Sequence, residues 1–141
     1  MSSVSITTKS FPMDGNKPFA LFSRSGDYIW LSGQTARDET GKLVGVGDIF
    51  AQERQVFTNI RAILNQAGCD LDSIVRLTTY FAVPLNEELS RRYWEIRREF
   101  FGDKPPASTG IQVAGLVTPD TLIEIDAIAY APVATTERDR A

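Results

Sequence analysis

The sequence contains no histidine and only one cysteine, Cys69. Without histidine there can be no Ser–His or Cys–His nucleophile pair, no histidine metal ligand and no imidazole base near neutral pH. A single cysteine excludes an internal disulfide and a cysteine-rich metal cluster. Any acid–base chemistry therefore falls to Asp, Glu, Lys, Tyr or bound water.

Long apolar runs and a strong net charge are also missing. No stretch approaches the roughly 18 apolar residues of a membrane span, and residues 1–15 lack the apolar core of a signal peptide. The formal net charge is -3, which does not favour nucleic acid as a partner. We therefore expect a cytoplasmic protein without membrane or nucleic-acid partners.

What is present suits a single α+β domain, because 141 residues can bury one apolar core. Apolar stripes predict one helix from an Asp48 N-cap to Gly68 and a second from an Asn86 N-cap to Gly102. We expect a six-stranded mixed sheet with both helices on one face. The domain is predicted to span residues 1–132, followed by a disordered tail over 133–141. Alternating or β-rich stretches predict the strands, at 1–9, 19–23, 28–31, 73–83, 106–116 and 121–132.

Alternation along the predicted strands assigns side chains to the two sheet faces. In the last strand, Ile123 and Ile125 share one face, whereas Glu124 and Asp126 share the other. Two helices cannot cover both faces, so apolar residues on the helix-free face predict a homo-oligomer joined sheet to sheet. In the strand over 73–83, the residues predicted to share one face are Val75, Leu77, Thr79 and Phe81.

The acidic pair on the last strand has two interpretations. Glu124 and Asp126 could both face solvent, or one could be a carboxylate that holds a hydrolytic water at an interface cleft. Two acids this close raise each other's proton affinity. Periodicity alone leaves both interpretations open.

Five segments together resemble the RidA family of reactive-intermediate deaminases, also called the YjgF family. The resemblance covers roughly residues 15–131 and implies a chorismate-mutase-like homotrimer with clefts between subunits. It also implies hydrolysis of imines or enamines of 2-oxo acids to the oxo acid and ammonia, with no cofactor and no metal. The segments are "SGQ" at 32–34, "GDIFAQERQVFTNIRAIL" at 47–64, "AGCDLDSIVRLTTYF" at 67–81, "FFGDKPPA" at 100–107 and "LIEIDAIAY" at 122–130.

The resemblance carries site residues over one at a time. Ser32 and Gly33 match cleft-lining residues, and Glu124 matches the glutamate that holds the attacking water. Phe19 stands where the family has a tyrosine, so the ring is kept and the hydroxyl is lost. Trp94 stands where the family has an asparagine.

One family residue is absent. The deaminases have an arginine after "PPA", whereas this chain continues with Ser108, Thr109 and Gly110, which we assign to substrate binding. An arginine fork binds a carboxylate through two charge-assisted hydrogen bonds, and serine offers one neutral donor. We therefore expect weak turnover of small 2-imino acids such as 2-iminopropanoate.

Two replacements for the missing arginine are open. Trp94, Phe19 and Phe22 could line an apolar cleft for a substrate without a carboxylate. Alternatively, another arginine could take over the role, and the candidates are Arg24, Arg91, Arg97 and Arg98.

Three functions remain in competition. The first is a divergent deaminase acting on a small-molecule imine or enamine through Glu124. The second is a non-catalytic trimer that binds a small metabolite or a partner protein, which the lost arginine and tyrosine favour. The third is a nuclease, an activity attributed to some family members; the lack of histidine, the negative net charge and the lack of a basic–aromatic stripe argue against it.

Overall fold

The computed structural model describes residues 6–9 and 17–133. Of the disordered tail predicted over 133–141, residues 134–141 lie outside the described residues, as do residues 1–5 of the predicted first strand. In chain order the elements are β1 (Ile6–Lys9), β2 (Phe22–Ser25), β3 (Tyr28–Gln34), α1 (Ile49–Gln66), a short 3₁₀ turn (Leu71–Ser73), β4 (Ile74–Phe81), α2 (Glu87–Phe101), β5 (Ala107–Gln112) and β6 (Ile123–Tyr130).

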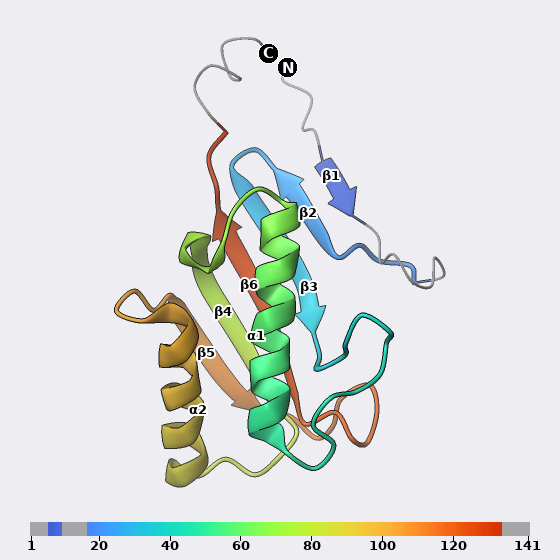
Figure 1. Cartoon of the computed structure of the whole chain (residues 1–141), viewed down its shortest axis with the longest axis vertical. Helices are drawn as coiled ribbons and strands as arrows, with labels where there is room; N and C mark the ends of the chain where they lie inside the picture. The colour runs from blue at the N-terminus through green and yellow to red at the C-terminus, as the bar shows by residue number, and fades with distance from the viewer. Residues whose placement is uncertain (1–5, 10–16, 134–141) are drawn as a thin grey trace.

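The strands form one mixed sheet in the order β1-β2-β3-β6-β4-β5 (Figure 1). Five strands, β2 to β6, form its body, and the short β1 pairs along the outer edge of β2. The pair β4–β5 is parallel and the other pairs are antiparallel. As a result β6, the last strand in the chain, lies in the centre of the sheet between β3 and β4.

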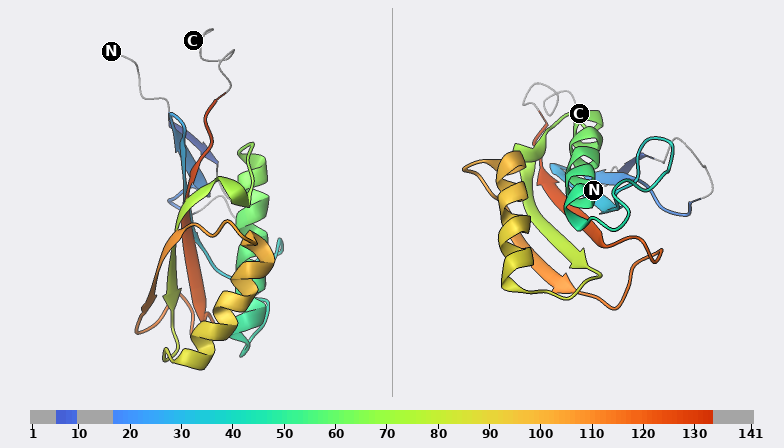
Figure 2. Two further views of the ribbon diagram at one scale, coloured as in Figure 1. Left: turned by 90° about the vertical axis from the view of Figure 1, so that its left-hand side faces the viewer. Right: turned by 60° about the horizontal axis from the view of Figure 1, so that its bottom comes forward.

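Both helices pack on one face of the sheet and leave the other face without a helix (Figure 2). This two-layer α+β arrangement agrees with the layer predicted from the sequence. The core between the layers is apolar, and β6 contributes Ile123, Ile125, Ala127 and Ala129 to it, all at most 2% exposed. The alternation predicted for this strand is therefore confirmed.

Local signals determine where the helices begin and end. The Asp48 carboxylate accepts hydrogen bonds from the backbone N–H groups of Phe50 (3.0 Å) and Ala51 (3.1 Å), which would otherwise lack partners at the start of α1. Asn86 caps α2 in the same way, through the N–H of Leu89 at 2.8 Å. Gly68 and Gly102, directly after the two helices, have positive φ. These caps confirm the predicted helices.

Two strand predictions need correction. The predicted strand over 19–23 is displaced, because β2 begins at Phe22. Phe22 pairs with Leu31 and is buried in the core at 7% exposure. It therefore fills the helix-covered face and cannot line a surface cleft as proposed from the sequence. The hairpin turn itself lies at Gly26 and Asp27, where Gly26 supplies a positive φ of 57°.

The face predicted for Val75 is wrong. The β4–β6 register shifts between Ile74 and Arg76, which indicates a bulge at Val75. An extra residue reverses the alternation, so Ile74 and Leu77 both enter the core while Val75 is 44% exposed. Thr79 and Phe81, beyond the bulge, face the core as predicted.

Two polar side chains of α1 are fully buried, although the sequence stripe did not include them. Gln52 donates to the carbonyl oxygens of Gly45 (3.0 Å) and Asp120 (2.8 Å), and accepts from the N–H of Leu122 at 2.9 Å. Glu53 has neither carboxyl oxygen hydrogen-bonded within the described part of the chain. Burial is the main cause that raises the pKa of Glu53 from 4.5 to about 9.

The raised pKa of Glu53 predicts how stability depends on pH. The folded chain keeps a proton that the unfolded chain releases above about pH 4.5, so the stability contributed by the neutral acid is lost as pH rises from 4.5 towards 9. We expect Glu53→Gln to be more stable than the wild type at pH 8. The gap should widen by up to about 1.4 kcal/mol per pH unit. Urea unfolding at pH 5, 6.5 and 8 measures it, and a gap independent of pH contradicts the prediction.

Candidate functional site

The carboxyl group of Glu124 lies directly against the backbone of Gly33. A Cβ atom added to Gly33 would lie 2.8 Å from Glu124 Oε2 and 2.9 Å from its carboxyl carbon. Only glycine leaves room for this approach. The two residues come together because β3 and β6 are neighbours, and their register shifts between Leu31 and Gln34. This contact joins two of the residues predicted for the site.

Glu124 lies on the helix-free face beside another acid. Its neighbours Ile123 and Ile125 point into the core, so Glu124 points the other way. Partial burial, and then the charge of Asp126, raise the pKa of the Glu124 carboxyl. Asp126 accepts a hydrogen bond from the Tyr80 hydroxyl at 3.0 Å, which orients it along the strand. A carboxyl group with a raised pKa can accept a proton from water and return it.

Ser32, which directly precedes Gly33 in β3, is held by hydrogen bonds. Its hydroxyl donates to the carbonyl oxygen of Ala20 at 2.6 Å, and its own carbonyl accepts from the Gln34 amide at 3.0 Å. Phe19 directly precedes Ala20 and its side chain is 51% exposed. Phe19 is therefore not core filling, and it lies one residue from the backbone that Ser32 binds. We call Ser32, Gly33 and Glu124 the acid half of the site.

Gln52 holds the segment that leads into β6. Its amide bridges the carbonyls of Gly45 and Asp120, and its oxygen accepts from Leu122 N–H, two residues before Glu124. The Gln52 residue itself is 0% exposed. Gln52 thus ties the N-terminal turn of α1 to the segment that leads into β6, a role that the sequence reasoning missed.

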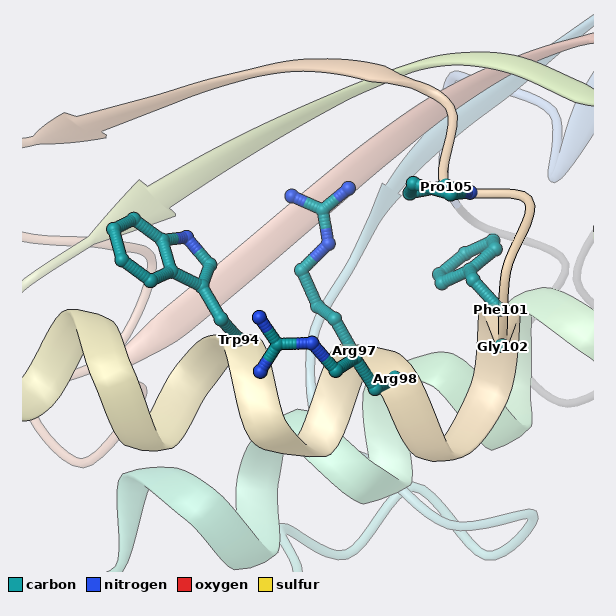
Figure 3. A pocket seen from close by; sticks show the side chains of 6 residues that line it. All are labelled: Trp94, Arg97, Arg98, Phe101, Gly102 and Pro105. Carbon is teal, nitrogen blue, oxygen red and sulfur yellow. The ribbon is translucent and has the colours of Figure 1, made fainter.

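The residues predicted around the missing arginine lie at another edge of the molecule. A pocket of about 230 Å³ opens between α2 and the segment before β5 (Figure 3). This is smaller than the roughly 300–1,000 Å³ of pockets for drug-sized ligands. Its lining residues are Trp94, Arg97, Arg98, Phe101, Gly102 and Pro105.

Arg97 reaches Ser108, the position at which the family resemblance implies an arginine. Its Nη1 donates to Ser108 Oγ at 2.7 Å. Its guanidinium carbon lies 5.6 Å from the Tyr93 ring centroid and 5.9 Å from that of Phe101, within cation–π distance. A guanidinium from helix α2 therefore reaches the β5 position where this chain has serine. We call Trp94, Arg97 and Ser108 the arginine half of the site.

The other arginine candidates have different surroundings. Arg24 donates to the backbone oxygens of Gly26, Ala67 and Ala131 and so ties together loop ends. Arg91 forms an exposed pair with Glu95 at 2.6 Å. Arg98 lines the same pocket as Arg97 and is exposed. Of the four candidates, Arg97 has the contact with Ser108.

The last two predicted residues, Thr109 and Gly110, point to opposite faces of β5. Thr109 accepts a hydrogen bond from Arg76 at 2.6 Å and shares its register position with Thr78. A Cβ atom added to Gly110 would approach the Phe81 ring at 3.2 Å. Neither residue contacts the acid half.

One chain does not bring the two halves together. Ser108 pairs with Leu77, whose side chain is in the core, so Ser108 faces the helices. Glu124 points to the helix-free face of the same sheet. Side chains on opposite faces of one sheet cannot meet on a single small ligand. The predicted site is therefore incomplete within one subunit.

Other chemistries find no support in the described part of the chain. Among residues 6–9 and 17–133 no group of three or more His, Cys, Asp or Glu side chains is placed to hold a metal ion. Neither helix there is long and apolar enough to cross a membrane. Cys69 is half-buried, and burial raises the pKa of its thiol, which disfavours the reactive thiolate.

Comparisons with known proteins agree with this fold. The family model described as endoribonuclease L-PSP matches residues 13–131. A RutC family protein of Pyrococcus abyssi is 39% identical over 114 residues, which cover 80% of this chain and 86% of that protein. The 3-aminoacrylate deaminase RutC of Acinetobacter baylyi is 32% identical over 117 residues, covering 80% of this chain and 86% of that protein.

A solved structure leads to the same family. The crystal structure of a member of the YjgF/YER057c/UK114 family from Mycobacterium tuberculosis superimposes with a TM-score of 0.75 and 27% identity. The match covers 90% of this chain and 100% of that one. With a family model spanning residues 13–131 and a relative at 39% identity, the chain belongs to the RidA/YjgF family.

Proposed function

We propose that this protein is a deaminase that hydrolyses a carboxylate-bearing imine or enamine to the oxo compound and ammonia. The observation that carries the proposal is the Glu124 carboxyl, held against Gly33 with a raised pKa. The activity named for the Acinetobacter baylyi relative, 3-aminoacrylate deaminase, is of the same type. The reaction consumes one water and needs no cofactor.

In the proposed mechanism Glu124 acts as the general base and then as the general acid. It takes a proton from water while the water oxygen bonds to the imine carbon. It then gives that proton to the nitrogen, which forms a carbinolamine. Glu124 next takes the hydroxyl proton and passes it to the amino group, so that the C–N bond breaks and ammonia leaves as the C=O bond forms. An enamine substrate first takes up a proton at its carbon to become the imine. A carboxyl group whose pKa is raised towards neutral suits these transfers.

The complete site is proposed to form between subunits of a homotrimer. The acid half and the arginine half lie on opposite faces of one sheet, so a second chain must supply one of them. The helix-free face also exposes a cluster of aromatic rings. Tyr28 lies 5.8 Å from Trp30 and 5.2 Å from Tyr130 between ring centroids, and each is at least 43% exposed. Packing of this face against a neighbouring subunit would bury them.

Arg97 is proposed to hold the substrate carboxylate. An arginine at position 108 would project its guanidinium well beyond the strand, whereas Arg97 keeps its guanidinium beside the Ser108 hydroxyl at 2.7 Å. The anion would then lie closer to β5, and a substrate must be longer to reach a Glu124 carboxyl of another subunit. The 53% exposed Trp94 offers apolar surface for such a substrate. This supports a preference altered from three-carbon 2-iminopropanoate.

The alternative is a non-catalytic trimer that binds a small metabolite or a partner protein. Phe19, which lacks the hydroxyl of the family tyrosine, and the exposed Trp94 favour it. The two functions differ in their dependence on Glu124. A binding protein needs the shape of this side chain, whereas a deaminase needs its proton transfer.

Glu124→Gln is expected to abolish turnover. The amide keeps the shape but cannot accept a proton from water, so ammonia release from enzymatically generated imines and from 3-aminoacrylate should fall by roughly 10²–10⁴-fold. Glu95→Gln, an exposed substitution on α2, is the matched control and should keep full activity. Full activity of Glu124→Gln would contradict the deaminase proposal. A wild type that releases no ammonia from any imine tested would favour the binding protein.

Gly33→Ala is expected to lower kcat while the fold stays intact. The new methyl would lie 2.8 Å from Glu124 Oε2 and displace the carboxyl, and a shift of about 1 Å can cost up to roughly 10²-fold in rate. The displaced atoms end a flexible side chain, so stability should change by less than about 0.5 kcal/mol. Gly115→Ala is the control, because a Cβ there meets nothing within 4 Å. Equal kcat values for the two variants would contradict the geometry.

Moving the guanidinium from position 97 to position 108 tests the role of Arg97. Arg97→Ser should reduce kcat/KM for acid-bearing imines on the order of 10²-fold, because a substrate carboxylate loses its charged partner. The double variant Arg97→Ser/Ser108→Arg has the same composition and returns the guanidinium to the strand. It should regain activity and shift preference towards 2-iminopropanoate. Arg91→Ser, on the same helix, controls for lost charge; if it costs as much as Arg97→Ser, Arg97 has no special role.

A further inference from the structure

Glu53 is buried without a hydrogen-bond partner in the described structure. Its side chain is 0% exposed, and both carboxyl oxygens lack a donor among the described residues. An unpaired carboxyl in the interior costs several kcal/mol unless it stays protonated. For packing alone, an apolar residue would be enough at this position. The acid group therefore points to a role that depends on the residues around it.

Contacts between the two helices locate Glu53. The helices run side by side in the same direction (Figure 1). Before Glu53, the Arg92 guanidinium lies 3.8 Å from the Phe50 ring centroid. After it, the centroids of Phe57 and Phe101 are 5.4 Å apart. Glu53 therefore lies level with the stretch of α2 between Arg92 and Phe101, which includes Tyr93 and Arg97.

The charged and titratable groups facing Glu53 are few. Arg54, on its own helix, is held by Glu99 of α2 through hydrogen bonds of 3.2 and 2.9 Å. The Tyr93 hydroxyl shares a 2.6 Å hydrogen bond with Thr79 of β4. Arg97 has five N–H donors, of which one reaches Ser108. The charge of Arg97 also acts on the Glu53 carboxyl, whose pKa it lowers.

We propose that Glu53 is a positioning residue for Arg97: protonated, it leaves the guanidinium turned to Ser108 and the pocket; ionised, it draws the guanidinium inward and weakens anion binding. This inference rests on the proposed role of Arg97 as the carboxylate anchor. Glu53 itself does not touch the substrate. It acts by setting which of two partners Arg97 binds.

The direction of the pH effect follows from linkage. Burial first, opposed by the charges of Arg54 and Arg97, brings the pKa of Glu53 to about 9, so the acid is neutral at pH 7. Glu99 raises this pKa further. Anion binding favours the outward Arg97 and thereby the protonated acid, so anion and proton bind cooperatively. Raising the pH through 9 should release the proton and weaken the anion.

The test measures binding of pyruvate by calorimetry between pH 7 and 10. Pyruvate carries the carboxylate of the proposed products. A single proton with a pKa near 9 predicts roughly tenfold weaker binding at pH 10 than at pH 8 for the wild type. Glu53→Gln, which mimics the neutral acid, should bind with the same affinity across this range. A merely structural role would lower affinity equally at every pH, and parallel pH curves for the two proteins overturn the proposal.

A second measurement needs no ligand. The Nε resonance of Arg97, assigned from its loss in Arg97→Lys, should move with pH around 9 in the wild type and stay still in Glu53→Gln. If the Arg97 resonance moves with pH in the wild type but pyruvate does not bind, the positioning role is supported. The proposed role of Arg97 as the carboxylate anchor is then contradicted. An Arg97 Nε resonance that does not shift with pH in the wild type overturns the positioning role. This result holds whether or not Glu53→Gln folds.

Discussion

The central position of β6, between β3 and β4, is the constraint on which the candidate site depends. Strand alternation sends Ile123, Ile125 and its two alanines into the core and its acids to the opposite face. The neighbour β3 then brings Gly33 under the carboxyl of Glu124. A strand at the edge of the sheet could supply the same alternation, but it would have a neighbour on one side only. The bare backbone of Gly33 and the hydroxyl of Tyr80 flank the acids from two sides because β6 lies between their strands.

Buried polar groups on α1 connect this strand to the rest of the fold. Gln52 satisfies three backbone groups and holds the approach to β6, so its burial is compensated. The adjacent Glu53 has no such compensation and stays neutral instead. Gln52 and Glu53 are consecutive in α1, but each lies near a different half of the candidate site. One supports the acid half through backbone hydrogen bonds, and the other faces the helix that carries the arginine half.

A guanidinium from helix α2 reaches Ser108 on β5, the position at which the family resemblance implies an arginine. Ser108 is too short to reach an anion, yet its hydroxyl accepts from Arg97 and keeps that guanidinium at the strand. The aromatic rings of Tyr93 and Phe101 support the same side chain from the core side.

Predictions that depended on neighbouring residues were the accurate ones. The Asp48 and Asn86 caps act within three residues, and the alternation of β6 requires no partner. Val75 was assigned to the wrong face because a bulge depends on the pairing of two distant strands. Gln52 and Glu53 were overlooked because a polar residue beside an apolar stripe is normally assigned to the exposed face of a helix. Only its partners in the folded chain show that it is buried.

The sequence by itself determined the layer arrangement, the helix ends and the family resemblance, since these depend on local chemistry and periodicity. Only the tertiary structure decided that Arg97, of four arginines, meets Ser108, and that Glu124 packs on Gly33. It also decided that Ser108 and Glu124 lie on opposite faces of one sheet. Each of these depends on which strands pair and in what register, and pairing across many residues of chain leaves no local signal in the sequence.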